Sequence, residues 1–389
     1  MKPWVASFSV VAFSSLASSA GEVPLPKFRP VEIDSKIEIG YGIAVADVEG
    51  DGKPDILLAD KKQIVWYRNP GWEKFVIAES LTKLDNVCIA AADIDGDGQA
   101  EIAVGAGWNP SDTTGSGAVF YLMPPKDRTQ KWDAVQLPHE PTVHRMKWVR
   151  QNSGKYQLVV VPLHGRGNKD GEGAGVKILA YEMPVNPQDQ WNTKVLNDSW
   201  HLTHNFELKR NSGTSRADDL LVASKEGVFE LQNGQVKQLA GKQQGGFQGA
   251  GEVRLGKLPA TFVTTVEPMH GNQIVVYTPT SESNGVWRRN AIDSSLKEGH
   301  ALACGDLLGT GSDQIIAGWR GKDAQGKTGI RVFTALDNEG KNWRATMLDD
   351  NGIACEDLCL ADLNGDGKLD IVASGRATKN VKIYLNERE

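Results

Sequence analysis

Histidines and a glutamate recur at one position of a repeating frame in this chain. The frame places His144, His204, His300 and Glu356 at the start of corresponding strands. Imidazole and carboxylate groups gathered in this way can bind a transition metal such as zinc and leave a coordination position open for a substrate. A histidine can instead act alone as a general base, because its unperturbed pKa is about 6.5. A third interpretation is that these polar residues only hydrate a channel.

Arginines, further histidines and hydrogen-bonding side chains accompany these four residues in the same frame. In a proton abstraction next to a carbonyl, guanidinium groups or a metal would stabilise the negative charge that develops on oxygen. The candidate catalytic residues are His144, His164, His204, His270, His300, Arg166, Arg320 and Arg376. The candidate substrate-binding residues are Tyr41, Asn86, Arg145, Asn205, Asp357 and Lys379. The candidate metal ligands of this site are His144, His204, Glu252, His300 and Glu356.

A second set of candidate ligands lies in an acidic motif that occurs three times. It reads ADVEGDGKPD at 46–55, ADIDGDGQAE at 92–101 and ADLNGDGKLD at 361–370, and a degenerate copy at 305–314 keeps Asp306. Oxygen ligands from a glycine-bearing turn suit calcium, but the alternative is a metal-free turn in which Asp caps backbone amides. Only the three good copies are expected to bind calcium. Their candidate ligands are Asp47, Glu49, Asp51, Asp55, Asp93, Asp95, Asp97, Glu101, Asp362, Asn364, Asp366 and Asp370.

The elements that position these residues follow from the phase of the acidic motif. A short apolar strand precedes each motif, three more strands follow it, and the fourth often opens with tryptophan. This frame repeats seven times with a period of about fifty residues, which predicts an all-β, seven-bladed propeller of four-stranded antiparallel blades. Because the strands alternate in direction, the acidic loops lie at one end of the blades. All seven histidines are then expected at the other end, with those in first strands lining the axis.

Composition and the N-terminus limit the function and location of the protein. The formal net charge of -6 argues against a nucleic-acid partner, which requires a basic surface. Residues 1–20 have the pattern of a signal peptide cleaved after Ala20, which predicts a periplasmic or extracellular protein whose residues 21–389 form a single propeller. No later segment has the ~20 apolar residues of a membrane span. Cys355 and Cys359 lie too far apart along one strand to pair, and the four cysteines are expected to be free thiols.

Two resemblances to known families extend this interpretation. The acidic motif resembles the FG-GAP/VCBS class of propeller blade. The segments around the histidines resemble the propeller domain of the aldos-2-ulose dehydratases (1,5-anhydrofructose dehydratases) over about residues 138–386. The segments that carry this resemblance are HR at 144–145, PLHGRGN at 162–168, HNF at 204–206, GAGE at 249–252, EPMHG at 267–271, GHAL at 299–302, CED at 355–357 and GRATKN at 375–380.

The second resemblance implies an activity. Members of that family remove water from a keto-sugar with metal assistance at the propeller, and they carry cupin domains for a following isomerisation. This sequence ends directly after its seventh blade, so the isomerisation is not expected. The leading hypothesis is an exported lyase that acts on a sugar or small oligosaccharide, with zinc or another divalent metal at the axial site. The alternatives are a non-catalytic, lectin-like propeller and a uronate polysaccharide lyase.

Overall fold

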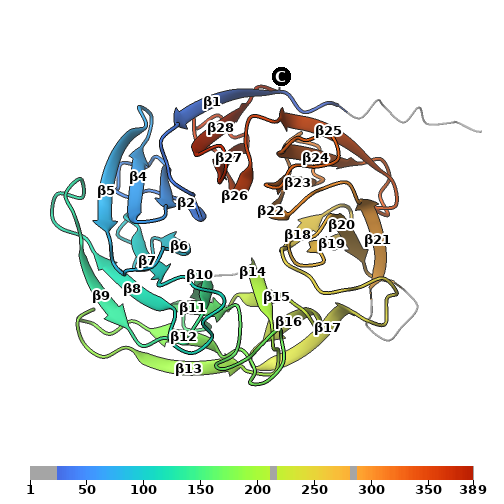
Figure 1. Cartoon of the computed structure of the whole chain (residues 1–389). Helices are drawn as coiled ribbons and strands as arrows, with labels where there is room; N and C mark the ends of the chain where they lie inside the picture. Colours follow the sequence, from blue (N-terminus) through green and yellow to red (C-terminus); the bar gives the residue numbers. More distant parts are fainter. Residues whose placement is uncertain (1–23, 211–216, 281–286, 389) are drawn as a thin grey trace, which may run out of the picture.

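The protein is a ring of seven four-stranded antiparallel sheets around a central axis (Figure 1). The computed structural model describes residues 24–210, 217–280 and 287–388. The predicted seven-bladed propeller is therefore confirmed, and no helix that could cross a bilayer occurs in these three segments. The predicted signal peptide lies outside the described residues.

Each blade runs from an innermost first strand to an outermost fourth strand. The first strands are β2 (Gly42–Ala46), β6 (Cys88–Ala92), β10 (Val143–Arg150), β14 (Thr203–Lys209), β18 (Val253–Lys257), β22 (Gly299–Gly305) and β26 (Cys355–Ala361). The second strands are β3 (Asp55–Ala59), β7 (Glu101–Ala106), β11 (Tyr156–Pro162), β15 (Asp219–Ser224), β19 (Thr261–Glu267), β23 (Gln314–Trp319) and β27 (Asp370–Gly375). The third strands are β4 (Gln63–Arg68), β8 (Ala118–Met123), β12 (Ile178–Glu182), β16 (Gly227–Gln232), β20 (Gln273–Thr278), β24 (Gly329–Ala335) and β28 (Asn380–Asn386). The fourth strands of blades one to six are β5 (Glu73–Glu79), β9 (Asp133–Leu137), β13 (Asn192–Asn197), β17 (Gln235–Gly241), β21 (Arg288–Asp293) and β25 (Trp343–Asp350).

The fourth strand of blade seven comes from the opposite end of the chain. Strand β1 (Phe28–Asp34) pairs antiparallel with β28, so that Val31 lies opposite Ile383 (Figure 1). The repeating frame gave the last unit no fourth strand, because this strand precedes the first repeat. A hydrophobic cluster that includes Ile56 of blade one and Val372 of blade seven packs across the same joint. Pairing and packing together close the ring.

The hydrophobic core is divided among the joints between neighbouring blades. Every residue of β3 and of β7 is buried, because both faces of each sheet pack against other blades. At the joint between blades one and two, Trp66 packs in one cluster with Phe120 and Ile102. Full burial of a large apolar side chain contributes about 1.5–3 kcal/mol. The blades therefore stabilise one another, and the residues at the axis are held on a rigid scaffold.

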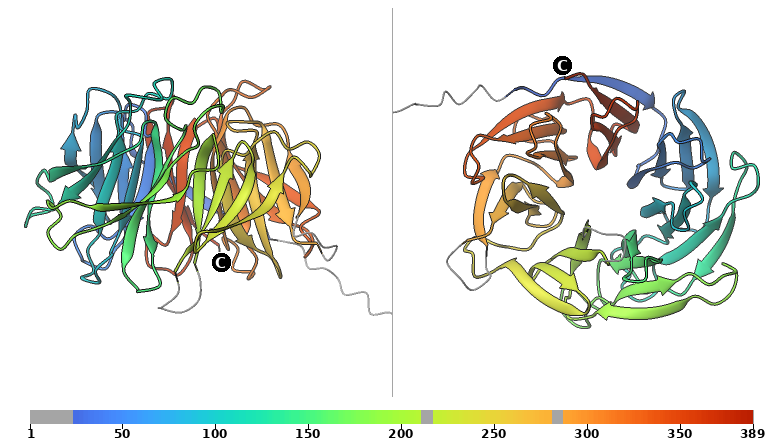
Figure 2. Two further views of the ribbon diagram at one scale, coloured as in Figure 1. Left: turned by 90° about the horizontal axis from the view of Figure 1, so that it is seen from below. Right: turned by 180° about the vertical axis from the view of Figure 1, so that it is seen from behind.

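The acidic turns connect first and second strands at one end of the ring, and Figure 2 shows the loops of the two opposite ends from the side. Asp47 accepts hydrogen bonds from the amides of Gly50 and Gly52, both at 2.7 Å. Asp93 and Asp362 accept from the corresponding glycines of their own turns. Both glycines of the first turn have positive φ angles of 78° and 82°, which favour glycine. The motif therefore specifies a turn in which each first Asp caps backbone amides.

Candidate functional site

The predicted axial residues lie at irregularities of the first strands. The pairing between first and second strands shifts register where the sequence passes from Val143 to Arg145, and equivalent shifts occur in blades four, six and seven. Such bulges insert an extra residue and re-aim its side chain. Strands β2, β6 and β18 pair with their second strands without a shift. The residues within the shifted segments are His144, His204 with Asn205, His300 and Glu356.

Three imidazole rings meet at the axis. The ring centroids of His204 and His270 are 4.6 Å apart, those of His270 and His300 are 4.9 Å apart, and those of His204 and His300 are 5.2 Å apart. The Nε2 atoms of His204 and His270 are separated by only 2.7 Å. One candidate ligand nitrogen from each ring lies within 4.8 Å of the other two. The topology thus brings together residues from three different blades.

The loop that carries His270 is firmly anchored. His270 has a left-handed backbone conformation with φ 54°, and the amide of Gly271 donates to the carbonyl of Pro268 at 2.7 Å. The Gly271 carbonyl accepts from the amide of Gly299 at 2.9 Å, next to His300. A Cβ atom on Gly271 would lie 2.2 Å from the Glu267 carbonyl oxygen, so glycine is required there. The positions of His270 and His300 are therefore coupled through the backbone.

The hydrogen bonds of the rings indicate which nitrogens carry protons. His300 Nδ1 lies 2.5 Å from the carbonyl oxygen of Glu356, which can only accept, so Nδ1 carries the proton and Nε2 carries a lone pair. His144 Nδ1 lies 2.7 Å from the carbonyl oxygen of His204. An Nη1 group of Arg145 donates to His144 Nε2 at 3.2 Å. His144 is consequently held by its neighbours through both nitrogens, whereas His300 keeps Nε2 for a ligand or a proton.

A buried carboxylate contacts the third ring. Glu252 Oε1 lies 3.2 Å from His204 Nδ1, and Glu252 Oε2 accepts from Asn205 at 2.5 Å and lies 3.2 Å from Arg254. Burial alone would raise the pKa of Glu252, but the contact with His204 and the charge of Arg254 hold this pKa at about 2. The carboxylate is therefore ionised and orients His204 so that Nε2 faces His270. A carboxylate or carbonyl on the far nitrogen of a histidine is typical of metal-ligating histidines.

Burial keeps the imidazoles neutral. It lowers the pKa of His270 to about 2, assisted by the nearby His204, which disfavours a second protonated ring, and by the charge of Arg320. It also lowers the pKa of His204, although Glu252 opposes the shift, and it lowers the pKa of His300 well below the usual value. The pKa of His144 is lowered in the same way by burial and by the charge of Arg145. Neutral rings can bind a metal without competition from protons.

Two arginines and one glutamate form the charged side of the site. Arg320 donates to both carboxylate oxygens of Glu356, at 2.9 and 2.7 Å, and Arg376 donates to one of them at 2.9 Å. Burial alone would lower the pKa of Arg376, but Glu356 raises it. The Arg376 guanidinium also lies 5.3 Å from the ring centroid of Tyr41, whose hydroxyl donates to Asp85 at 3.2 Å. Fixed guanidinium groups of this kind can stabilise an oxyanion.

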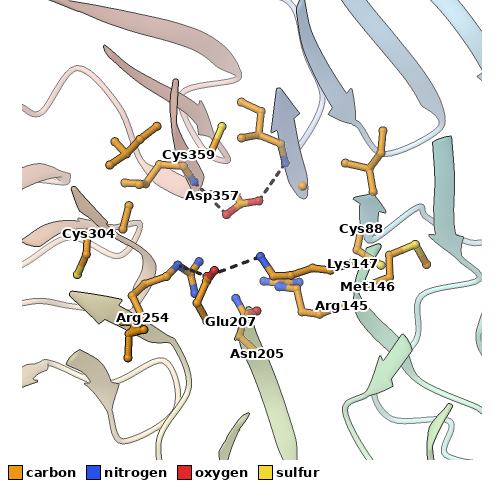
Figure 3. Close-up of a pocket in the computed structure, with 17 residues that line it drawn as sticks. Cys88, Arg145, Met146, Lys147, Asn205, Glu207, Arg254, Cys304, Asp357 and Cys359 are labelled. Atoms are coloured by element: carbon orange, nitrogen blue, oxygen red, sulfur yellow. Dashed lines mark hydrogen bonds and ion pairs between the residues drawn. The ribbon is translucent and has the colours of Figure 1, made fainter. Parts of the chain in front are cut away.

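The described residues enclose two cavities along the axis. The upper cavity, of about 180 Å³, is lined by Tyr41, Val87, Trp108, Pro110, His144, Arg145, His270, His300, Arg320, Glu356 and Arg376. The lower cavity, of about 300 Å³, is shown in Figure 3 and contains Arg145, Lys147, Asn205, Glu207, Arg254 and Asp357. Arg145 borders both cavities. Burial raises the pKa of the three thiols that line the lower cavity, Cys88, Cys304 and Cys359, and all four cysteines are free.

Several predicted site residues lie away from the upper cavity. Asn86 is buried and donates to the carbonyl of Asp60 at 2.8 Å, which is a structural contact. Arg166 is exposed and lies 3.2 Å from Glu140. His164 is partly buried, and its backbone amide donates to the Thr142 hydroxyl. Lys379 is exposed in the loop between β27 and β28. Asn205 and Asp357 line the lower cavity instead.

The grouping of candidate metal ligands also differs from the sequence prediction. His204 and His300 of the predicted set join His270 in the cluster. Glu252 contacts the far nitrogen of His204, His144 contacts Arg145, and Glu356 is bound by two arginines. At the other end of the blades, Asp93, Asp95 and Glu101 place one oxygen each within 4.8 Å of the others.

Sequence reasoning missed one wall of the cavity, which is formed by Trp108 and Pro110. Both residues lie in the loop between β7 and β8. Loops between second and third strands carry His270, Arg320 and Arg376 in other blades, so position in the frame was the available signal. Neither residue is ionisable, so residue type alone does not mark them as site residues.

Comparisons with known proteins agree with the resemblances. The family model "Aldos-2-ulose dehydratase, beta-propeller domain" matches residues 116–280, and FG-GAP repeat models match residues 38–104 and 89–122. The sequence is 23% identical over 370 residues to aldos-2-ulose dehydratase of Phanerodontia chrysosporium, which includes 85% of this chain and 39% of that protein. This chain thus spans about two fifths of the length of that relative. The region matched by the aldos-2-ulose dehydratase propeller model contains His144, His204, Glu252 and His270, and it ends before His300.

Similar folds occur in solved structures of other proteins. The structure titled BBS1N in complex with ARL6DN matches with a TM-score of 0.59 and 16% identity, covering 94% of this chain and 97% of that one. A chain of the Mitotic Checkpoint Complex matches with a TM-score of 0.58 and 12% identity over 100% of both chains. Identities this low show the propeller fold alone.

Proposed function

We propose that this protein is a carbon–oxygen lyase that removes water from a keto-sugar. The observation that carries the proposal is the cluster of His204, His270 and His300, of which His270 and His300 line one small cavity together with two fixed guanidinium groups. The match to the aldos-2-ulose dehydratase propeller supports the same reaction class. The cavity volume of about 180 Å³ is below the ~300–1,000 Å³ of sites for drug-sized ligands, which favours a single sugar ring over a polymer chain.

In the proposed reaction, His300 Nε2 takes the proton from the carbon next to the carbonyl group. The Glu356 carbonyl keeps the His300 ring oriented through Nδ1. As the C–H electrons move toward the carbonyl, Arg320 and Arg376 stabilise the negative charge on its oxygen. The C–O bond at the next carbon then breaks, and the proton held by His300 passes to the departing hydroxyl group. Water and an unsaturated carbonyl compound are the products.

A divalent cation such as zinc would fit the same cluster as an alternative to this reaction, because His300 Nε2 would then be a ligand and not the base. His204, His270 and His300 would hold it, because their nitrogens converge and the far nitrogens of His204 and His300 face a carboxylate and a carbonyl. Such a cation would supply Lewis-acid polarisation of the substrate carbonyl. Metal analysis of the purified protein, combined with turnover before and after chelation, separates the cation-assisted reaction from the metal-free one.

The direct test of the function is turnover of aldos-2-uloses and other keto-sugars. Formation of a conjugated enone is followed by ultraviolet absorbance, and the product is identified by mass spectrometry as the substrate minus water. Turnover by the wild type and its loss in His300→Asn would support the proposal. Binding without turnover for every keto-sugar would favour the lectin-like alternative.

We also propose that the protein is exported and that it binds calcium. Export concerns the N-terminal residues, and calcium binding concerns the acidic turns at the end of the blades opposite the histidines. The sequence of residues 1–20 supports export, and N-terminal sequencing of the mature protein tests cleavage after Ala20. The convergence of Asp93, Asp95 and Glu101 supports calcium binding in the second blade. Calcium titration with thermal unfolding as the readout tests this site, and Asp95→Asn should weaken the stabilisation by calcium without changing turnover.

A further inference from the structure

The upper cavity has two chemically different walls. Blades three, five, six and seven contribute imidazole, guanidinium and carboxylate groups. Blades one and two contribute Val87, Trp108 and Pro110, together with the ring of Tyr41. A ligand that only coordinated a metal or paired with arginine would gain nothing from the second wall. The cavity therefore matches a ligand with one hydrocarbon face and one face rich in oxygen.

Trp108 is held rigidly in this wall. Its amide donates to the carbonyl of Asp85 at 3.0 Å, and the two residues form an isolated β-bridge. Gly107 has a φ of 69°, and a Cβ atom there would lie 2.9 Å from the backbone of Gly117. The rest of the loop is closed by Asp112, which accepts from the amide of Gly115 at 2.8 Å. The backbone that carries the indole ring thus has a fixed place.

The ring of Trp108 also has a defined relation to the reactive groups. Its centroid lies 5.0 Å from that of His144, with an angle of 31° between the planes. Trp108 packs partly against the core cluster shared by blades two and three, and it stays partly exposed where it borders the cavity. A flat, preorganised aromatic surface binds a ligand with little loss of conformational entropy.

We propose that Trp108 is the sugar-binding platform of this site. One C–H-rich face of a single sugar ring stacks on the indole, and the opposite edge, which carries the carbonyl and hydroxyl groups, faces His300, Arg320 and Arg376. This inference rests on the proposed function for the identity of the reacting groups. Trp108 would thus be an additional substrate-binding residue. It would favour sugar rings that have one face made only of C–H groups.

The experiment compares Trp108→Ala with Trp108→Phe and with Trp343→Ala. Trp343 is also partly exposed, but it opens β25 on the outer side of its blade, so its truncation controls for the loss of an indole elsewhere. With an aldos-2-ulose as substrate, Trp108→Ala should raise KM about tenfold, equivalent to about 1.4 kcal/mol, with a smaller change in kcat. Trp108→Phe and Trp343→Ala should change KM less than threefold. Equal KM values for Trp108→Ala and the wild type would overturn the platform.

A second measurement keeps this test separate from that of the dehydratase. Saturation-transfer NMR with 1,5-anhydroglucitol, a sugar ring without a carbonyl group, reports binding without reaction. Transfer to the ring C–H protons in the wild type and its loss in Trp108→Ala would support the platform even if no keto-sugar is turned over. Absence of transfer in the wild type, or equal transfer in Trp108→Ala, would refute it, whatever the outcome of the turnover assay.

Discussion

The two ends of the blades are built by different means. At the acidic end, each turn is completed by its own residues, as when Asp47 caps Gly50 and Gly52. At the histidine end, His204, His270 and His300 come from three consecutive blades and meet only when those blades pack together. The acidic turns repeat one local geometry, whereas the histidine site occurs once in the part of the chain that the structure describes. The repeats therefore supply the scaffold, and departures from the repeat supply the candidate site.

The largest expected effect separates the two ends by activity. His300→Asn keeps a side-chain amide near the Glu356 carbonyl but removes Nε2, so turnover should fall by roughly 10²–10⁴-fold. Asp95→Asn in the acidic turn should leave kcat/KM unchanged. Steady-state kinetics on folded protein, checked by circular dichroism, measure both variants. A loss of activity in Asp95→Asn equal to that in His300→Asn would contradict the assignment of catalysis to the histidine end alone.

The next effect concerns the buried charges behind the histidines. Glu252→Gln removes one of the two carboxylate partners of Arg254, at 3.2 Å, and leaves Glu207 at 3.4 Å. The loss of stability should therefore be below the about 3–5 kcal/mol that is typical of breaking a buried ion pair. The contact of Glu252 with His204 is also weakened, so metal affinity should fall by about 10–100-fold. Denaturant unfolding and metal titration measure these changes. The control is Glu298→Gln, because Glu298 is half exposed and its pair with Arg320 should contribute less than about 1 kcal/mol.

The pH dependence of stability should have opposite signs at the two ends in metal-free protein. The pKa of His270 is lowered in the fold to about 2, so the unfolded chain binds the proton more readily. The contribution of His270 to the free energy of unfolding is present above pH ~6.5. It falls by roughly 2 kcal/mol between pH 6.5 and 5. The pKa values of Asp55 and Glu101 are raised by burial to about 6 and about 7. The contribution of these two carboxyl groups to the free energy of unfolding is present at low pH and is lost as the pH rises through these values.

Thermal unfolding in EDTA across pH 4.5–8 measures this difference, a range chosen to include the unperturbed pKa of ~6.5 for histidine. His270→Phe should remove a gain in stability with rising pH below about pH 6.5, whereas Asp55→Asn should remove a loss of stability with rising pH between about pH 4 and 6. Added calcium should restore stability mainly at neutral pH if it binds the carboxylates. The same curve in all three proteins would contradict the assignment of opposite signs.

The smallest expected effect tests the local character of the acidic turn. Gly52 has a φ of 82° and open space around its Cα, so Gly52→Ala adds only backbone strain and should cost about 1–2 kcal/mol. Gly71 also has open space but no positive φ, so Gly71→Ala should be neutral or slightly stabilising. Turnover should be unchanged in both. Equal unfolding temperatures for the two variants would argue against a strained, locally determined turn.

The sequence was sufficient for the architecture wherever the information is local. The phase of the acidic motif gave the strand order, the number of blades and the end at which His144, His204 and His300 lie. It could not give the fourth strand of blade seven, because β1 precedes the first repeat and pairs with β28 at the far end of the chain. Nor could it give the register shifts in the first strands, since a bulge depends on the pairing between two strands.

The composition of the cavity was decided by the tertiary structure. The sequence identified the candidate catalytic and ligand residues and predicted, from the alternation of strand direction, that they lie at one end of the blades. Only the closed ring decided that His270 completes the cluster, that Glu252 contacts its far side, and that Asn86, Arg166 and Lys379 lie outside the cavity. The physical reason is that distances across the axis depend on blade number, loop conformation and bulges together. Motif spacing determines a turn, but contacts between blades exist only after the neighbouring blades have packed.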